Sequence, residues 1–182
     1  MSYEIEDGFW KQDIIGHAAP KFFGGYTNTL SYKNWSLISL FTFSHGGQLI
    51  YQKDVSDMGF SGLPNEGVRS LEHYSSSNTG SDRPRYLLND TQFLTNLNVY
   101  DASYIKLKSI TLSYSLPASL LQKLRINTLT VYATGTNIFT ITHYPGPDPE
   151  VSDDPRSVIG GGRDVSTYPT VKSYTLGVRL GF

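Results

Sequence analysis

Polar and apolar residues alternate most regularly at the end of the chain, where residues 173–182 read SYTLGVRLGF. The apolar set consists of Tyr174, Leu176, Val178, Leu180 and Phe182. A period of two residues predicts an extended strand with one apolar face. Soluble sandwiches and membrane barrels both contain such strands, so the pattern alone leaves open whether this face meets a protein core or lipid.

Similar patterns, rich in aromatic and β-branched residues, predict four more strands. The expected strands span about 20–32, 35–45, 103–116, 126–140 and 171–182. Only Lys33 and Asn34 separate the first two, which predicts a tight turn. In the third, Lys106 and Lys108 share parity with the apolar set, so either a bulge intervenes or that end lies beyond the apolar zone.

The connections between these strands alternate between short and long. Residues 33–34 and 117–125 make the short ones, whereas 46–102 and 141–169 make long ones. The first long connection contains one candidate helix, PNEGVRSLEHY at 64–74, with Asn65 as a possible N-cap. Tight turns at one end and long loops at the other are typical of outer-membrane barrels. The pattern therefore favours an all-β membrane barrel of antiparallel strands over a soluble β-sandwich.

The composition excludes several classes of protein. The chain has 13 Tyr and 9 Phe, only 17% charged residues and a formal net charge of −1. Because it has no basic stripe, nucleic-acid binding is not expected. It has no cysteine, which excludes disulfides and thiolate metal sites. No apolar run approaches the roughly 20 residues of a spanning helix, and the acidic start MSYEIEDGFW lacks the features of a signal peptide.

Candidate chemistry is sparse. One acidic cluster consists of Asp148, Glu150, Asp153 and Asp154. Carboxylates this close can hold Ca²⁺, but the EF-hand spacing is absent and prolines interrupt the stretch, so a solvated acidic loop is the preferred interpretation. No metal-ligand spacing relates the four histidines, which are His17, His45, His73 and His143. We expect no catalytic residue, no cofactor site and no metal site.

In a barrel, aromatic residues near strand ends would lie between hydrocarbon and water. The candidates for this girdle are Tyr32, Trp35, Tyr104, Tyr114 and Tyr174. The alternative is that such rings belong to a sandwich core or a sugar-binding surface. Arg179 belongs to the polar set of the last strand, so in a barrel it would face the interior, because on the lipid face near mid-membrane it would cost about 2–4 kcal/mol.

Five stretches follow one another in an order known from one family. They read IIGHAAPKFFGGYTNTLSYKNWSL, GGQLIY, DASYIKLKSITLSYSLP, VYATGTNIFTITHYPGPDPE and YPTVKSYTLGVRLGF. Together, from about Ile14 to Phe182, they resemble the C-terminal end of SusC/RagA-type TonB-dependent transporters. Members of this family are outer-membrane proteins of Gram-negative, Bacteroidetes-like bacteria that import oligosaccharides or peptides.

The resemblance implies that residues 1–182 form the C-terminal arc of a larger barrel, with the plug and N-terminal domains outside this chain. Such barrels have 22 strands, of which this chain would supply about five. The implied partners are a SusD-like surface lipoprotein, TonB acting through the plug region, the outer-membrane assembly machinery, the lipid bilayer and a glycan or peptide substrate. Loops 46–102 and 141–169 would contact the substrate and the lipoprotein.

Phe182, preceded at alternate positions by Leu180, Val178, Leu176 and Tyr174, looks like the C-terminal signal of the assembly machinery, which can read a strand by strand addition. A strand that simply ends in Phe is the alternative. Two other functions remain open. One is a soluble β-sandwich carbohydrate-binding module, and the other is a surface hydrolase that would use the acidic group from Asp148 to Asp154.

Overall fold

The chain divides into two compact units. The first unit comprises residues 1–19, 47–101 and 150–168, and the second comprises 20–46, 102–149 and 169–182. The structure, a computed structural model, describes residues 5–6, 9–10, 13–52, 68–81, 83, 85, 96–124, 126–151, 162–165 and 168–182. Within these residues, no helix combines the length and the apolar character needed to cross a membrane.

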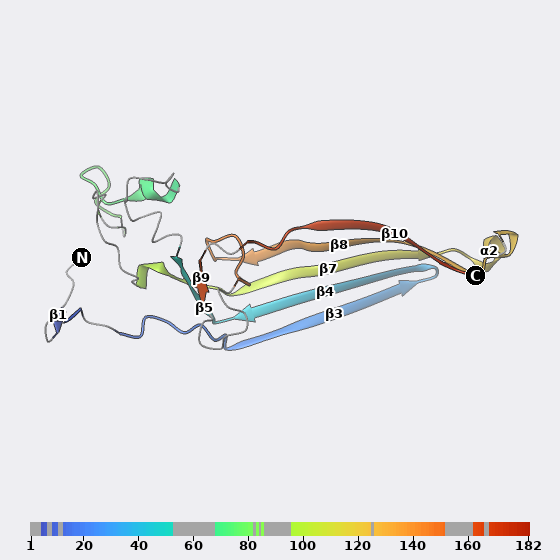
Figure 1. Cartoon of the computed structure of the whole chain (residues 1–182), viewed down its shortest axis with the longest axis horizontal. Coiled ribbons are helices and arrows are strands. Elements are labelled where there is room, and N and C mark those ends of the chain that lie inside the picture. Colours follow the sequence, from blue (N-terminus) through green and yellow to red (C-terminus); the bar gives the residue numbers. More distant parts are fainter. Residues whose placement is uncertain are drawn as a thin grey trace. The chain divides into compact units, whose positions relative to one another are not determined.

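The second unit is built on one sheet of five antiparallel strands in the order β10-β8-β7-β4-β3 (Figure 1). The strands are β3 (Phe22–Tyr32), β4 (Trp35–His45), β7 (Tyr104–Ser115), β8 (Thr128–Thr142) and β10 (Ser173–Gly181). Each begins and ends within two residues of the range expected from the sequence. The main sheet is therefore an up-and-down arrangement, in which successive strands lie side by side as in a barrel wall.

Short connections gather at one end of this sheet, here called the hairpin end. Lys33 has a φ of 53°, the left-handed conformation that suits a tight hairpin, and it joins β3 to β4 with Asn34. The helix α2 (Ala118–Leu124) joins β7 to β8. Hydrogen bonds tie these connections to neighbouring strands, since the Ser115 N–H donates to Asn34 O (2.9 Å) and the Asn127 N–H to Gly181 O (2.9 Å). The opposite end is called the loop end.

The first unit contains short strands that the sequence pattern did not reveal. Its sheet pairs β5 (Gln48–Tyr51) with β6 (Val99–Asp101) in antiparallel fashion and with β9 (Arg163–Asp164) in parallel fashion. A further small sheet pairs β1 (Ile5–Glu6) with β2 (Phe9–Trp10). Strands of two to four residues are too short to show alternation, and β5 and β9 are far apart in sequence. The expectation that these connections are irregular apart from one helix is therefore wrong.

The helix expected at 64–74 corresponds only in part to a described element. Val68–Glu72 forms a 3-10 helix, and a second 3-10 helix spans Asn96–Asn98. The expected N-cap, Asn65, lies outside the described residues.

Candidate functional site

The register of the main sheet aligns apolar side chains across all five strands. One row consists of Tyr32, Trp35, Tyr114, Val131 and Val178, and the next row consists of Leu30, Leu37, Leu112, Ala133 and Leu176. The side of the sheet that carries these rows is called the apolar face, and the other side the polar face. Within the first row, the rings of Trp35 and Tyr114 lie with their centroids 4.7 Å apart. Three of the expected girdle residues thus lie together at the hairpin end.

The apolar face is exposed. Leu176 is 85% exposed, Val178 60% and Leu180 50%. The described part of the second unit contains no second sheet that could bury this face. A β-sandwich, in contrast, packs the apolar sides of two sheets against each other. The soluble sandwich is therefore not favoured by this arrangement.

The height of the apolar face matches a bilayer. The face runs from the row containing Tyr32 to the pair Phe22 and His45, which is the length of the 11-residue strand β3. At ~3.3 Å per residue, ten steps along an extended strand cover ~33 Å. A tilt of about 40° reduces this to roughly 25 Å, which is the height of the apolar band of an outer-membrane barrel.

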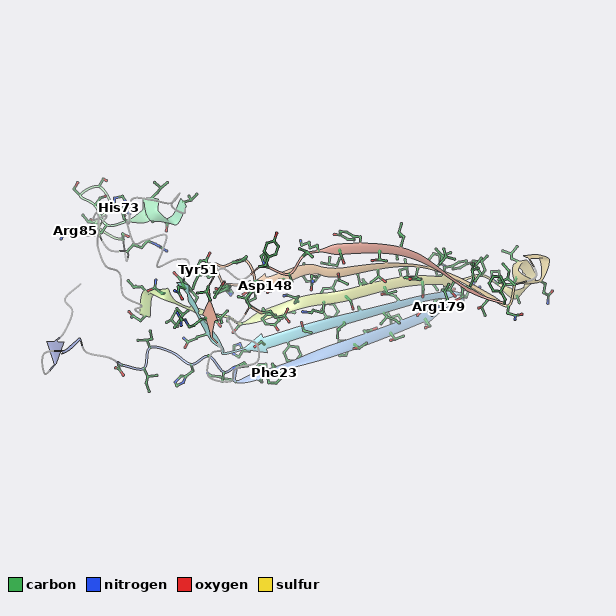
Figure 2. The ribbon with its side chains drawn as sticks, in the orientation of Figure 1. Phe23, Tyr51, His73, Arg85, Asp148 and Arg179 are labelled. Atoms are coloured by element: carbon green, nitrogen blue, oxygen red, sulfur yellow. The ribbon has the colours of Figure 1, made fainter. Side chains whose placement is uncertain are left out.

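The polar face carries hydroxyl side chains that bond across strands. Thr111 Oγ1 and Thr134 Oγ1 are 2.9 Å apart, and Ser115 Oγ and Thr130 Oγ1 are 3.1 Å apart. Arg179 pairs with Thr130 and so belongs to this face, as its parity predicted; Figure 2 shows it near the hairpin end. A polar side with one arginine fits an aqueous surface better than hydrocarbon.

A β-bulge at Lys108 adds one extra residue to β7, so the residues that point to each face change parity at this position. Leu40 pairs with Ser109 whereas Phe41 pairs with Leu107, so Lys108 has no partner on β4. Before the bulge, Leu107 therefore lies on the apolar face and Lys106 on the polar face. This resolves the parity conflict seen in the sequence in favour of a bulge.

The same change of parity corrects one girdle prediction. Tyr104 pairs with Ser44 and Thr142, so it lies on the polar face with Lys106, whose Nζ is 5.6 Å from the centroid of the Tyr104 ring. Tyr104 is therefore not a member of the aromatic row of the apolar face. Tyr174 lies on the apolar face, but two rows away from Trp35.

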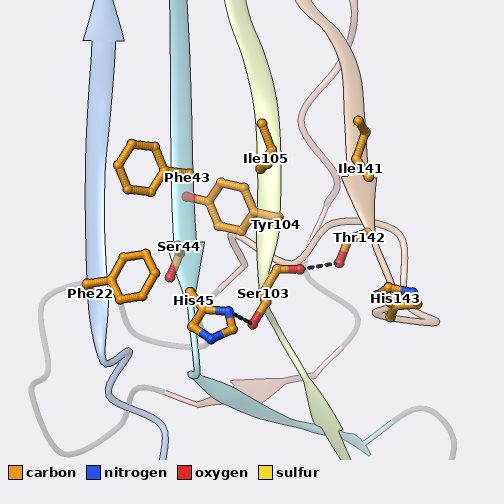
Figure 3. Close-up of a pocket in the computed structure, with 10 residues that line it drawn as sticks. All are labelled: Phe22, Phe43, Ser44, His45, Ser103, Tyr104, Ile105, Ile141, Thr142 and His143. Atoms are coloured by element: carbon orange, nitrogen blue, oxygen red, sulfur yellow. Dashed lines mark hydrogen bonds between the residues drawn. The ribbon is translucent and has the colours of Figure 1, made fainter.

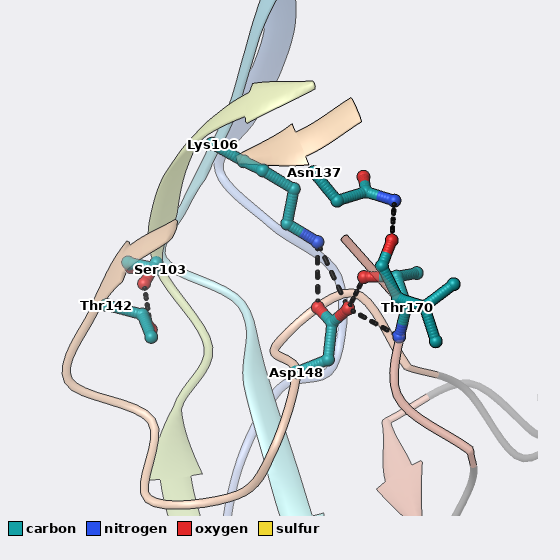
Figure 4. A network of polar contacts seen from close by, with 7 residues as sticks. Ser103, Lys106, Asn137, Thr142, Asp148 and Thr170 are labelled. Carbon is teal, nitrogen blue, oxygen red and sulfur yellow. Dashed lines mark hydrogen bonds and ion pairs between the residues drawn. The ribbon is translucent and has the colours of Figure 1, made fainter. Parts of the chain in front are cut away.

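Lys106 forms a buried ion pair with Asp148 (Figure 4). The Lys106 Nζ lies 2.9 Å from Oδ1 and 3.1 Å from Oδ2, and the two side chains are 1% and 4% exposed. The Thr170 hydroxyl and backbone N–H both donate to Asp148 Oδ2. Because a buried charge is costly unless it is paired and hydrogen-bonded, this arrangement fixes the loop after β8 against the sheet.

A second contact holds the segment that leads into β10. Asn137, on β8 opposite the bulge, has a φ of 51° and donates from Nδ2 to Val171 O (3.0 Å; Figure 4). Lys106, Asp148, Thr170 and Asn137 are called the ion-pair network from here on. Together with Val171 O they connect β7, β8 and the start of β10.

The network overturns the interpretation of Asp148 as part of a solvated acidic loop. Asp148 is buried and paired because the bulge turns Lys106 toward it. Two features of the sequence were unusual at these positions: Lys106 alternates with apolar residues, and Asp148 lies between two prolines. Neither feature indicates that the two side chains contact each other. Among the described residues, no three His, Asp or Glu side chains gather as metal ligands, and Asp153 and Asp154 lie outside those residues.

The loop that carries Asp148 is also packed tightly. Tyr144 is 5% exposed, and a Cβ added to Gly146 would lie 2.3 Å from the Tyr144 ring. Only glycine therefore fits beneath this ring. Residues 144–150 (YPGPDPE) thus contain a buried tyrosine ring, a glycine that leaves space for this ring and a carboxylate that pairs with Lys106.

The remaining candidate residues lie apart from this network. His17, His45 and His143 are exposed, whereas His73 is half-buried. Phe182 directly follows β10 and is 88% exposed. Among the described strands, β10 pairs only with β8, so its second edge has no partner there. The structure thus places Tyr174, Leu176, Val178 and Leu180 together on the apolar face of an edge strand.

No protein-family model matches the chain. Among curated proteins, TonB-dependent receptor P3 of Formosa agariphila is 35% identical over 173 residues, which are 93% of this chain and 17% of that receptor. TonB-dependent receptor SusC of Bacteroides thetaiotaomicron is 29% identical over 168 residues, which are 87% of this chain and 15% of SusC. The chain thus spans about one sixth of the length of these relatives.

Solved structures give the same result. A chain of the RagAB peptide importer in its open-open state has a TM-score of 0.80 and 27% identity, over 100% of this chain and 19% of that one. The RagAB peptide importer in its closed-closed state has a TM-score of 0.79 with the same coverage. The chain therefore belongs to the SusC/RagA family of TonB-dependent receptors, whose antiparallel barrel fold its five-stranded sheet shares.

Proposed function

We propose that this chain is part of the barrel wall of a TonB-dependent importer in the outer membrane of a Gram-negative, Bacteroidetes-like bacterium. The observation that carries this proposal is a one-layer sheet with an exposed apolar face, in a chain that matches 19% of a chain of the RagAB peptide importer along its own full length. The apolar face meets acyl chains, and the polar face meets the aqueous interior. The imported substrate is a glycan or a peptide.

The two ends of the sheet take different sides of the membrane. Short turns lie on the periplasmic side and long loops on the extracellular side of such barrels. The hairpin end, with Lys33 and α2, is therefore periplasmic. The excursions 46–102 and 141–169 are extracellular, where they contact the substrate and a SusD-like surface lipoprotein.

The chain supplies structure rather than chemistry. Residues 1–182 are the C-terminal part of the barrel, TonB acts through a plug region outside them, and no catalytic step belongs to this segment. Phe182 and the apolar residues of β10 form the signal for the assembly machinery. In support of this role, β10 offers one open edge among the described strands, to which a further strand can add.

Cysteine scanning of β10 tests the orientation, because the chain has no native cysteine. Val178→Cys and Leu176→Cys should react with a lipid-soluble maleimide in isolated outer membranes. Thr175→Cys and Arg179→Cys, on the polar face, should react with a charged, water-soluble maleimide after the membranes are opened. Equal labelling of both pairs by the charged reagent would overturn the membrane assignment.

An uptake assay tests the transport role. A strain that lacks the full-length gene should lose growth on a particular oligosaccharide or peptide source, and inactivation of TonB should have the same effect. Unchanged growth on every such source would remove the support for an importer while leaving the membrane assignment intact.

A further inference from the structure

A pocket lies at the loop end of the main sheet, where four strands begin or end. Its walls are apolar side chains, and polar side chains gather at the end nearest the loops (Figure 3). The apolar residues are Phe22, Phe43, Ile105 and Ile141, and the polar ones include His45, Ser103 and His143. The pocket therefore has an amphipathic lining.

The apolar walls belong to the apolar face of the sheet. Phe43, Ile105 and Ile141 pair in one row across β4, β7 and β8. Phe22 meets Phe43 edge to face, with centroids 6.3 Å apart, and packs against the His45 ring at 5.0 Å. Phe22, Ile105 and Ile141 are all exposed. Such a channel suits a hydrocarbon chain.

The polar end lies where the apolar rows stop. His45 pairs with Phe22, and its Nδ1 lies 3.5 Å from Ser103 Oγ across the gap between β4 and β7 (Figure 3). His143 follows β8 two residues beyond Ile141. Strands lie ~4.8 Å apart, so β4 and β8, with β7 between them, are separated by roughly 10 Å. Imidazole N–H and hydroxyl groups donate hydrogen bonds to phosphate oxygens.

The lining of this rim suits an anion. No carboxylate is among the described residues that line the pocket. The polar lining residues instead supply imidazole and hydroxyl groups. An anionic headgroup therefore meets hydrogen-bond donors here and no carboxylate in the lining.

We propose that this pocket binds one membrane lipid with a phosphate headgroup. An acyl chain lies against Phe43, Ile105 and Ile141, and the phosphate accepts hydrogen bonds from His45 and His143. This inference rests on the proposed function, because it requires the apolar face to meet lipid and the loop end to lie at the extracellular headgroups. The pocket thereby anchors the barrel wall at a fixed depth in the outer leaflet.

Native mass spectrometry of the full-length receptor, purified in detergent from outer membranes, tests the proposal. Phosphatidylglycerol and galactosyl diacylglycerol are the probes, since both carry two acyl chains and only phosphatidylglycerol carries a phosphate. The wild-type protein should retain phosphatidylglycerol more tightly. His45→Ala combined with His143→Ala should weaken its retention about a hundredfold, because two hydrogen bonds to a charged group are lost and each is worth roughly tenfold.

Two further variants make the result specific. His17→Ala combined with His73→Ala removes two histidines outside the pocket and should leave retention unchanged. Ile105→Trp fills the apolar channel and should lower retention of both lipids. Equal retention of the two probes by the wild-type protein, or no effect of the His45 and His143 changes, would overturn the proposal. Absence of the wild-type protein from outer membranes would instead refute the proposed function.

Discussion

At the scale of single residues, Lys106 shows most clearly how a local irregularity produces a site. Its parity would place it among apolar residues, but the bulge at Lys108 turns it to the polar face, where it meets Asp148 at 2.9 Å. A lysine that is 1% exposed needs such a partner, because an isolated buried ammonium group is costly to desolvate.

Removing one partner of this ion pair should therefore destabilise the protein. We expect Lys106→Met or Asp148→Asn to lower the free energy of unfolding by about 3–5 kcal/mol, because each leaves a buried group without its counter-charge. The measurement is urea unfolding of the full-length receptor in detergent, followed by tryptophan fluorescence.

The double variant Lys106→Met with Asp148→Leu should recover most of this loss, since an apolar pair of similar volume can replace a buried ion pair. The control is Lys172→Met, at an exposed lysine on the segment before β10. Single variants as stable as the control, or a double variant with the summed loss, would contradict the assigned role of the pair.

At the scale of elements, the strands of the main sheet were predictable and the bulge was predictable only as an alternative. Strands of 9 to 15 residues show enough alternation to define their limits. Strands β5, β6 and β9 are too short to show any, and they form because distant segments pair. The partnership of Lys106 with Asp148 was not predictable, because it depends on how a loop folds back onto the sheet.

Deleting Lys108 should impair assembly less than deleting Leu107. Lys108 is the extra residue of the bulge, so without it Leu107 can still pair with Phe41, and Lys106 stays on the polar face opposite Thr42. Deletion of Leu107 would instead place Lys108 opposite Phe41 on the apolar face, where a lysine is costly in lipid. We expect less folded receptor in outer-membrane fractions only for the Leu107 deletion, measured as the heat-modifiable band in electrophoresis; equal levels of both variants would contradict the assignment of the faces.

The terminal aromatic residue is a second prediction at this scale. Removing Phe182 should lower the amount of receptor in the outer membrane, because the assembly machinery would lose the aromatic end of the strand it reads. Phe182→Tyr keeps the ring and should assemble normally. Quantitative blots of membrane fractions provide the measurement, and an undiminished level after the deletion would favour the simpler interpretation that the strand only happens to end in Phe.

At the scale of the whole molecule, the main sheet has two edge strands whose outer backbone N–H and C=O groups need partners from elsewhere. Among the described strands, β3 and β10 each have a neighbour on one side only. In lipid, unpaired backbone N–H and C=O groups cost several kcal/mol each, and spanning sheets therefore close into barrels. This agrees with relatives that are about six times as long as this chain.

Expressed alone, residues 1–182 should not form a stable monomer in water. The exposed apolar face and the two open edges should cause aggregation, whereas addition of detergent should keep part of the material soluble. Analytical ultracentrifugation with and without detergent checks this. A detergent-free monomer with cooperative unfolding would instead support the soluble sandwich.

The sequence by itself determined the strands of the main sheet, their alternation, the uneven connections and the family, because these follow from local periodicity and from motifs in order. Only the tertiary structure determined which side chains of different elements contact each other. The bulge places Lys106 opposite Asp148, and pairing of distant segments creates the small sheet of β5, β6 and β9. Local pattern cannot determine such contacts, since they depend on backbone register and loop closure between residues far apart in the chain.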